Sequence, residues 1–337
     1  MNKPWRRIHA ARLFEGCRAV TLAAAVCAGA AGSASAADNY PTRPVRIIVG
    51  FSPGGFIDFT ARLIAAPLSA ALGQQVIADN RAGAGGVVGT ELAAHAAPDG
   101  YTLTVGSVGT HAVNQSLYPK LPYNVVRDFQ PIARLTDAPS ILAVHPSLPA
   151  RSVKELIALA RAQPGTIAYA SAGAGTSTHL AAVLFEHLAQ VKLVHVPYKG
   201  GGPAMVAVIA GEAPVTFGTA SSVSPLTKTG RLRGLAVTGA QRSAVLPDLP
   251  TIAESGLPGY EMMNWLGLFA PAGTPRPIVD RLSAEALRIV HMPDVVARMH
   301  AQGAEPSPLG PDQFGAFVKA EVDKWAKVVA STGMTTQ

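Results

Sequence analysis

Residues 45–55 read VRIIVGFSPGG. The β-branched run predicts a strand, and the glycine-rich turn that ends it leads into an Ala/Leu-rich helical pattern. A helix that begins directly after such a turn leaves unbonded backbone N–H groups and the positive end of its dipole facing one spot, which suits an anion. Residues 166–177, TIAYASAGAGTS, repeat this design. Two such seats, far apart in the chain, predict a clamp that holds one anion from two sides.

Strand-like runs alternate with apolar helical patterns through most of the chain. The runs span residues 45–51, 75–78, 101–106, 141–145, 166–170, 193–196, 215–217, 232–238 and 265–271. This alternation predicts an α/β fold in which parallel sheets lie between helices. Ligands of such sheets bind beyond the carboxyl ends of the strands, where both glycine turns lie. After the last run we expect three helices, the first beginning near Pro275 and the last spanning residues 311–330, and no further strand.

The N-terminal segment has the pattern of a secretory signal peptide. Three arginines within the first 12 residues precede an apolar stretch, residues 20–31, and the small-residue site Ala34-Ser35-Ala36. We interpret residues 1–36 as a signal peptide that is cleaved near Ala36, and we expect a periplasmic protein. The apolar stretch is shorter than the roughly 20 residues of a spanning helix. The arginine pair at positions 6 and 7 matches a twin-arginine signal poorly, which favours general secretion.

Composition narrows the functions that the remaining chain can have. Both cysteines, Cys17 and Cys27, lie in the predicted leader, so we expect no disulfide, thiol nucleophile or cysteine-based metal site. The formal charge of +7 falls to +3, from 23 basic and 20 acidic residues, once residues 1–36 are set aside. This balance lacks the electrostatic footprint of a nucleic-acid-binding protein. The roughly 300 residues that remain are enough for a large core and favour two lobes.

Nine short motifs occur in order along the chain. They are YPxRP (40–44), GFSPGGxxDxxAR (50–62), NRxGAGG (80–86), APDGYTL (97–103), LPY (121–123), SVxEL (152–156), HVPYKG (195–200), LPT (249–251) and APAGTP (270–275). Together they resemble the extracytoplasmic solute receptors of the tripartite tricarboxylate transporter family, also called Bug receptors. The match covers nearly the whole chain after the leader.

The resemblance implies a type II periplasmic-binding-protein fold, with two α/β lobes joined by two crossovers and a ligand cleft between them. Lobe 1 would comprise residues 37–140 and 262–337, and lobe 2 residues 141–261. The implied function is to capture a small organic carboxylate by closure of the cleft, without a cofactor or metal, and to deliver it to the membrane subunits of a tripartite transporter. We expect a monomer. A membrane signalling protein is an alternative partner, because the fold and pocket of a sensor would be the same.

In the family, turns that match the two described above grip one carboxylate, largely through backbone N–H groups. The predicted ligand-binding residues are therefore those of the two turns and of two further strand ends: Phe51, Ser52, Pro53, Gly54, Gly55, Asp58, Ser107, Thr110, Ser171, Gly173, Ala174, Gly175, Thr176, His179 and Tyr198. Asp58 either caps its helix or contacts the ligand, and Arg62 either neutralises Asp58 or faces solvent. We interpret His179 as a fixed hydrogen-bonding residue.

The chain departs from the family pattern at several positions near the predicted cleft. Phe56-Ile57 replaces a small residue and Thr, Ala174 stands where Asn is frequent, and Pro214 and Gly218 replace aspartates. These changes make the predicted cleft less polar and less acidic. They favour a monocarboxylate with an apolar or aromatic body over citrate or an acidic amino acid.

An enzyme is the main alternative from another class. The sequence has no Gly-x-Ser-x-Gly elbow, no Gly-x-x-x-x-Gly-Lys phosphate loop and no His-Glu-x-x-His pair. The glycine run at residues 83–89 matches a dinucleotide fingerprint only loosely, and we expect a turn that enters a helix. His179, His187 and His195 recur at eight-residue spacing, but His195 falls in another predicted element, so we expect no shared metal.

Overall fold

The computed structural model describes residues 39–198 and 200–334. The chain divides into two compact units, residues 1–42 and 43–337, and the fold below is that of the second unit. The predicted signal peptide and its cleavage near Ala36 lie outside the described residues. Within those residues, none of the helices combines the length and the apolar character needed to cross a bilayer.

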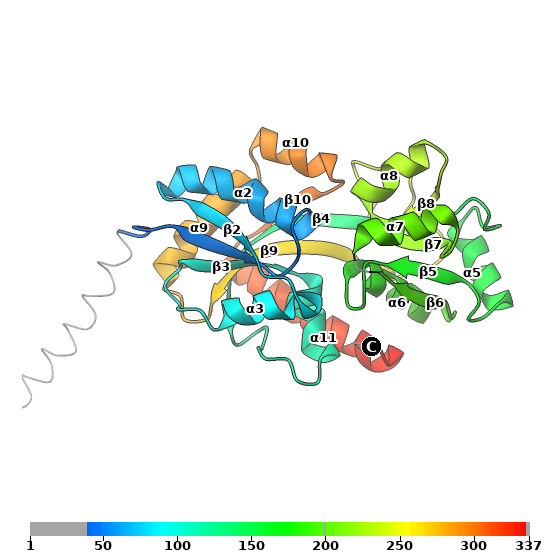
Figure 1. Ribbon diagram of the computed structural model, residues 1–337, viewed down its shortest axis with the longest axis horizontal. Coiled ribbons are helices and arrows are strands. Elements are labelled where there is room, and N and C mark those ends of the chain that lie inside the picture. The colour runs from blue at the N-terminus through cyan, green and yellow to red at the C-terminus, as the bar shows by residue number, and fades with distance from the viewer. Residues whose placement is uncertain (1–38, 199, 335–337) are drawn as a thin grey trace, which may run out of the picture. The chain divides into compact units, whose positions relative to one another are not determined.

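Sheet A combines parallel and antiparallel strands in the order β2-β1-β3-β9-β4, with β10 on the far edge of β4 (Figure 1). Its strands are β1 (Val45–Val49), β2 (Val76–Asn80), β3 (Thr102–Ser107), the first part of β4 (Phe129–Val144), β9 (Met263–Pro271) and β10 (Glu305–Leu309). The first three are parallel, and β9, β4 and β10 pair antiparallel. The carboxyl ends of β1 and β3 therefore lie at the same edge of the sheet.

Sheet B is smaller and is built around the last part of β4. Its other strands are β5 (Ala168–Ser171), β6 (Val194–Pro197), β7 (Val215–Thr219) and β8 (Arg233–Val237). β5 is parallel to both β6 and β7, whereas β4 pairs antiparallel with β7 and β8. β4 is thus a single 16-residue strand that belongs to both sheets: it pairs with β9 as far as Pro139 and with β7 from Ser140 onward.

Helices cover both sheets. Those beside sheet A are α2 (Phe56–Leu72), α3 (Val87–Ala94), α4 (Asn114–Leu117), α9 (Arg276–Ile289), α10 (Pro293–Ala301) and α11 (Pro311–Thr332), with a 3₁₀ turn η1 (Ala84–Gly86) and a π turn η2 (Gly109–Val113). Those beside sheet B are α5 (Val153–Ala162), α6 (Ser177–Ala189), α7 (Gly201–Ala210) and α8 (Ala220–Lys228) (Figure 1). α11 contacts β4 and α4, and it also reaches α6 on the other sheet.

Burial of apolar side chains stabilises this arrangement. Ile47 and Ile48 of β1 and Leu63 of α2 are fully buried, and each such side chain contributes about 1.5–3 kcal/mol. Trp265 and Trp325 are buried between β9 and α11, and both indole N–H groups donate to the carboxylate of Glu321, at 3.0 and 3.2 Å. Buried polar atoms are costly unless they are paired, so this shared acceptor removes the penalty for both rings.

The α/β prediction is confirmed, but two parts of it are wrong. The sheets are mixed rather than parallel, and a further strand, β10, follows the last predicted one. β10 has the sequence EPSPL. Its two prolines argue against a strand in the sequence pattern, but a strand at the edge of a sheet tolerates residues that have no backbone N–H to donate. The first part of β4 was also missed, since Pro131, Arg134 and Asp137 interrupt the apolar pattern.

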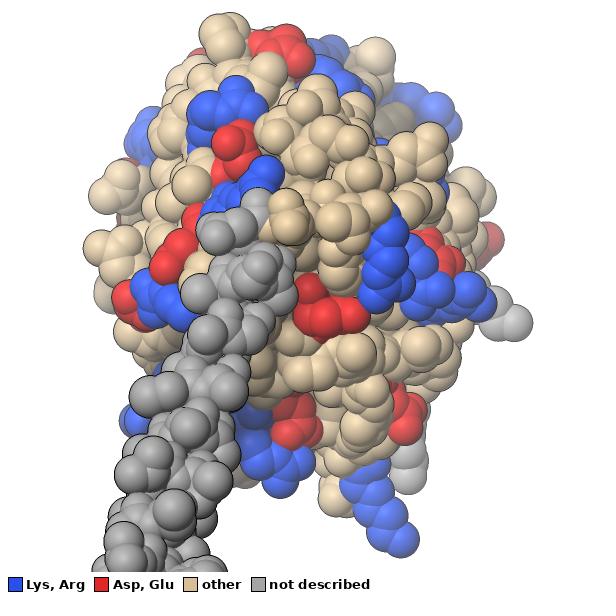
Figure 2. Space-filling model, turned by 90° about the vertical axis from the view of Figure 1, so that its left-hand side faces the viewer, with Lys and Arg blue, Asp and Glu red and all other residues tan. Residues whose placement is uncertain are grey.

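Basic and acidic side chains are interleaved on the face shown in Figure 2, without a field of one sign. Ion pairs among the described residues include Arg276 with Asp280 and Asp312 and Arg43 with Asp99. Exposed pairs of this kind contribute little stability each, so they are best understood as features of a solvated surface.

Candidate functional site

The first turn, residues 50–55, leaves the carboxyl end of β1 and enters α2. Gly50 approaches Gly86 so closely that a Cβ on it would lie 2.9 Å from the Gly86 carbonyl oxygen. Gly55 occupies the N-cap position of α2 without a side-chain hydrogen bond to the helix end. The N–H groups of Gly55, Phe56 and Ile57 have no acceptor among the described residues. The turn therefore presents three free backbone donors at a positive helix end.

The carboxylate of Asp58 fixes the first turn through hydrogen bonds. Its carboxylate accepts from the Gly54 N–H at 2.9 Å, from Arg62 at 3.0 Å and from Asn80 at 2.9 Å, and only 4% of the residue is exposed. Burial by itself would raise the pKa of Asp58, but the hydrogen bonds from Arg62, Gly54 and Asn80 outweigh it, so the pKa lies below its ordinary value. Arg62 thus neutralises Asp58, and the carboxylate braces the turn.

The second turn, residues 171–176, leaves β5 and enters α6 through the N-cap residue Thr176, which also makes no side-chain hydrogen bond to the helix end. The Gly173 N–H donates to Ser171 Oγ at 3.1 Å, and the Gly175 N–H donates to His179 Nδ1 at 3.1 Å. Both predicted donors are therefore engaged inside the turn. The N–H groups of Ala174, Ser177 and Thr178 have no acceptor among the described residues.

Ala174 was predicted to bind ligand and Ser177 was expected to open the helix, but the backbone N–H groups of Ser177 and Thr178 were not singled out. These two residues occupy the first two positions of α6, where backbone N–H groups have no partner within the helix. The predicted start of the helix, and not the glycines before it, is the sequence signal that would have identified these two N–H groups.

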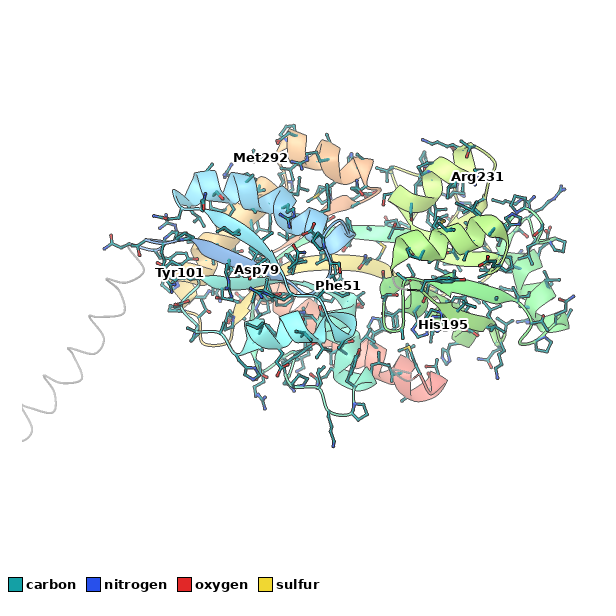
Figure 3. All side chains as sticks on the ribbon, in the orientation of Figure 1. Phe51, Asp79, Tyr101, His195, Arg231 and Met292 are labelled. Carbon is teal, nitrogen blue, oxygen red and sulfur yellow. The ribbon has the colours of Figure 1, made fainter. Side chains whose placement is uncertain are left out.

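The structure brings the two turns close together through residues between them in sequence. Phe51 and Thr110 both contact Gly86, where a Cβ would lie 2.6 Å from Thr110 Cγ2 and 2.8 Å from the Phe51 ring. Gly109, the residue before Thr110, lies close to the second turn, because a Cβ on it would lie 3.2 Å from the Gly175 carbonyl oxygen. Figure 3 shows Phe51 at the side of sheet A that faces sheet B. The predicted residues of both turns and of the β3 end therefore form one neighbourhood.

Ser107 and Thr110 lie beneath the surface of this neighbourhood. The Ser107 N–H donates to Thr110 Oγ1 at 3.0 Å, and Thr110 Oγ1 lies 2.9 Å from His111 Nδ1. His111 is fully buried and stacks on Phe269 with ring centroids 4.1 Å apart, and burial lowers its pKa to about 3. In this structure the two hydroxyls brace the end of β3 through a neutral imidazole.

Tyr198 touches the second turn through its backbone. Its N–H donates to the Ser171 carbonyl at 3.0 Å, and its side chain packs against an apolar cluster of sheet B that includes Val208. The phenol is partly exposed.

Two stacked histidines, His179 and His195, stabilise the second turn through hydrogen bonds. The rings of His179 and His195 stack with centroids 4.1 Å apart and planes 13° from parallel, and Ser171 Oγ lies 2.6 Å from His195 Nε2. Burial, together with the neighbouring His195, lowers the pKa of His179 to about 3, and burial also lowers the pKa of His195. A metal must lie in the plane of each imidazole that binds it, so two stacked rings do not share one ion. Among the described residues no group of three His, Cys, Asp or Glu side chains is placed to hold a metal.

The chain matches a known family of binding proteins. The family model "Tripartite tricarboxylate transporter family receptor" matches residues 60–334. The chain therefore belongs to this receptor family, whose members are periplasmic solute-binding proteins and not enzymes. The resemblance inferred from the nine motifs is confirmed.

Three solved structures show the same fold. The Rpa4515 protein of R. palustris, solved with adipate, is 37% identical with a TM-score of 0.81, covering 88% of this chain and 99% of that one. The periplasmic binding protein BugD is 34% identical with a TM-score of 0.78, covering 88% and 100%. MatC from Rhodopseudomonas palustris, solved with bound malate, is 35% identical with a TM-score of 0.77, covering 86% and 100%.

Proposed function

We propose that this chain captures a small organic carboxylate between the first and second turns in the bacterial periplasm. It then delivers that ligand to the membrane subunits of a tripartite tricarboxylate-type transporter. On this proposal residues 1–36 are the leader removed near Ala36, and the mature protein acts as a monomer.

The observation that carries the proposal is the pairing of two helix ends that lack side-chain caps. α2 and α6 both begin without such a hydrogen bond, as most helices of the described residues do, and this pair differs from the others because contacts through Gly86, Thr110 and Gly109 bring the two starts into one neighbourhood. Free N–H groups at a helix start favour an anion, and each charge-assisted hydrogen bond contributes about 1.5–3 kcal/mol. A carboxylate supplies two acceptor oxygens, one for each turn. Adipate and malate in the related structures belong to the same chemical class.

The side chains around the turns favour a ligand with an apolar body. The ring of Phe51 is partly exposed beside the free donors, and Phe56 and Ile57 follow directly in α2. Asp58 is already saturated by Arg62, Asn80 and Gly54, so it offers no free acceptor for a ligand amine. We therefore infer a monocarboxylate with an aliphatic or aromatic body in preference to citrate or an acidic amino acid.

Closure would occur about the strands that connect the two sheets. Lobe 1 is assigned to residues 37–140 and 262–337, and lobe 2 to residues 141–261, so that β4 crosses the boundary. A ligand held by both turns stabilises the closed form, and the membrane partner recognises the surface that closure creates.

A calorimetric titration tests this proposal with Gly55→Leu. Gly55 has φ −82° and ψ 170°, and its side-chain direction is open, so leucine adds bulk at the donors without backbone strain. Gly310→Leu is a matched control, because Gly310 is the N-cap of α11 with φ −72°, ψ 176° and open space around it. With phenylacetate, citrate and glutamate as probes, we expect phenylacetate to bind to the wild type and to Gly310→Leu, but not to Gly55→Leu.

Two results would contradict the proposal in different ways. Preferential binding of citrate would refute the inference that the ligand has an apolar body, but it would not refute the binding of a carboxylate between the two turns. A bound acid whose affinity is the same in Gly55→Leu would refute the clamp. At 100 times its dissociation constant a ligand adds about 2.7 kcal/mol of stability, so a thermal shift provides an independent measurement.

A further inference from the structure

A cavity of about 740 Å³ lies behind the second turn, away from the first one. Its walls come from α5, α6, β5 and β6, and from the last residues of the α11 segment, which include Ser331 and Met334. Figure 3 shows His195, one of the lining residues, on β6 well apart from Phe51. The volume is in the range of small-molecule sites, and nothing in the proposed function uses it.

Two buried polar side chains face this cavity without a partner. Tyr169 is 1% exposed and His179 is 6% exposed, yet neither the Tyr169 hydroxyl nor His179 Nε2 has a hydrogen-bond partner among the described residues. Within that part of the chain, His111 Nε2 is the one fully buried side-chain nitrogen or oxygen that lacks a partner. The Tyr169 and His179 atoms must therefore reach the surface of the cavity that both residues line. These two donors, each on a side chain that is otherwise buried, are therefore available to a ligand that enters the cavity.

The hydrogen bonds of the histidines determine which atoms donate. His179 Nδ1 accepts from the Gly175 N–H, and because the ring is neutral its proton is on Nε2, which becomes a donor toward the cavity. Ser171 Oγ already accepts from Gly173, so its own proton is available for His195 Nε2 and leaves Nδ1 of His195 as the second imidazole donor. With the Tyr169 hydroxyl, the inner wall supplies three neutral donors.

The cavity wall carries one more basic than acidic residue, and the acid, Glu186, lies close enough to Tyr169 to add to the effect of burial in raising the pKa of Tyr169. Arg161 and Lys192 are basic, Glu186 is the acid, and the lining histidines next to Tyr169 are neutral, which leaves one net positive charge. The Glu186 carboxylate also accepts from the Leu193 N–H at 2.7 Å, so one of its oxygens is already satisfied. Aliphatic surface completes the wall at Ala160, Val183, Val191 and Met334.

We propose that this cavity is a second binding site, for a short aliphatic monocarboxylate whose head accepts from Tyr169, His179 and His195 and whose chain lies along Val183 and Met334. The site is separate from the clamp between the turns, but it shares a wall with it. Ser171 and His179 accept from the Gly173 and Gly175 N–H groups; His179 itself lines the cavity, and Ser171 contacts His195, which also lines it. Occupancy of the cavity therefore stiffens the second turn, because hydrogen bonds in a chain polarise one another.

The test is a titration of the full chain with butyrate, followed by NMR of ¹⁵N-labelled histidine side chains. The Gly55→Leu background removes binding at the clamp, so that any shift of His179 arises from the cavity. We expect the ring signals of His179 and His195 to shift and saturate. The signal of His145, which contacts Ser147 just after β4 and so lies two strands away from β5 in sheet B, remains unchanged.

Two variants make the assignment specific. Tyr169→Phe removes a hydroxyl without leaving a void, and it is expected to raise the midpoint of the titration about tenfold. Tyr118→Phe is the matched control, since the Tyr118 hydroxyl donates to Ala84 far from the cavity, and it leaves the midpoint unchanged. Ser331→Trp, at an exposed position of α11, fills the cavity from the other side and abolishes the shift.

The proposal is overturned if butyrate up to about 50 mM produces no saturable shift, or if Tyr169→Phe leaves the midpoint where it is in the wild type. Because the measurement is made with the clamp blocked, its outcome does not depend on whether the clamp binds a carboxylate. Calorimetry on the wild type tests the clamp separately.

Discussion

The first and second turns share a backbone design but are braced by opposite chemistry. Asp58 holds the first turn through charge, with Arg62 and Asn80 completing the network. Ser171 and His179 hold the second turn through neutral groups. Both arrangements fix a loop so that backbone donors beside it remain free. Bracing is therefore independent of anion binding, and the two turns should respond differently to mutation and to pH.

Removing the charged brace should have the largest effect. Asp58→Ala leaves the Gly54 N–H, Arg62 and Asn80 without their acceptor in a buried place, so we expect a loss of about 3 kcal/mol in the free energy of unfolding. Denaturant titration measures it. Asp294→Ala, an exposed acid in the first turn of α10, is the control and should cost a few tenths of a kcal/mol. A loss as small as that of the control would mean that Asp58 does not brace the turn.

The neutral brace should be weaker and replaceable. His179→Leu deprives the Gly175 N–H of its acceptor and removes the stack on His195, which should cost about 2 kcal/mol. His179→Asn supplies an amide oxygen near the position of Nδ1 and should recover part of that stability. Equal stability of the two variants in the same denaturant titration would show that the hydrogen bond contributes nothing.

Mild acid should separate the two turns. The folded-state pKa of His179 is about 3 against 6.5 when unfolded, so the unfolded chain binds more protons between these values and stability falls as the pH drops below 6.5. The same sign holds for Asp58, but its window lies below the ordinary carboxyl pKa of 3.8. From pH 6.5 to 5.5 we expect the second turn to lose about 1 kcal/mol of protection while the first keeps its own.

Amide hydrogen exchange resolved by residue is the suitable measurement for this comparison. His111 titrates in the same window beside sheet A, so global unfolding alone does not distinguish the turns. The His179→Asn variant serves as the control and should lose the extra sensitivity of the second turn. Equal acceleration of exchange in both turns would contradict the contrast between them.

The smallest effect should follow from Arg62. Its side chain is 52% exposed, so the ion pair with Asp58 is screened by solvent and Arg62→Gln should cost much less stability than Asp58→Ala. Addition of salt should reduce the wild-type advantage in a denaturant titration. If Arg62→Gln lowered the free energy of unfolding as much as Asp58→Ala does, the guanidinium and not the buried carboxylate would be the main stabilising group of this network.

Much of the candidate site was predictable because local patterns specify local structure. The two turns, the helices after them and the strands before them follow from β-branched runs, glycines and apolar periodicity within some 20 residues. The family motifs also predicted the function, that of an extracytoplasmic solute receptor. Gly173 and Gly175 were named as donors on the same local grounds, whereas in the structure their N–H groups donate to Ser171 and His179.

The sequence by itself determined the α/β class, the two turns and the lack of any cysteine after Cys27, since each depends on neighbouring residues or on composition. Tertiary structure alone decided that β4 serves two sheets, that β10 closes an edge, and that His179 stacks on His195 beside a cavity. Those features arise from contacts between segments far apart in the chain. Their energies depend on burial and pairing partners that no local pattern encodes.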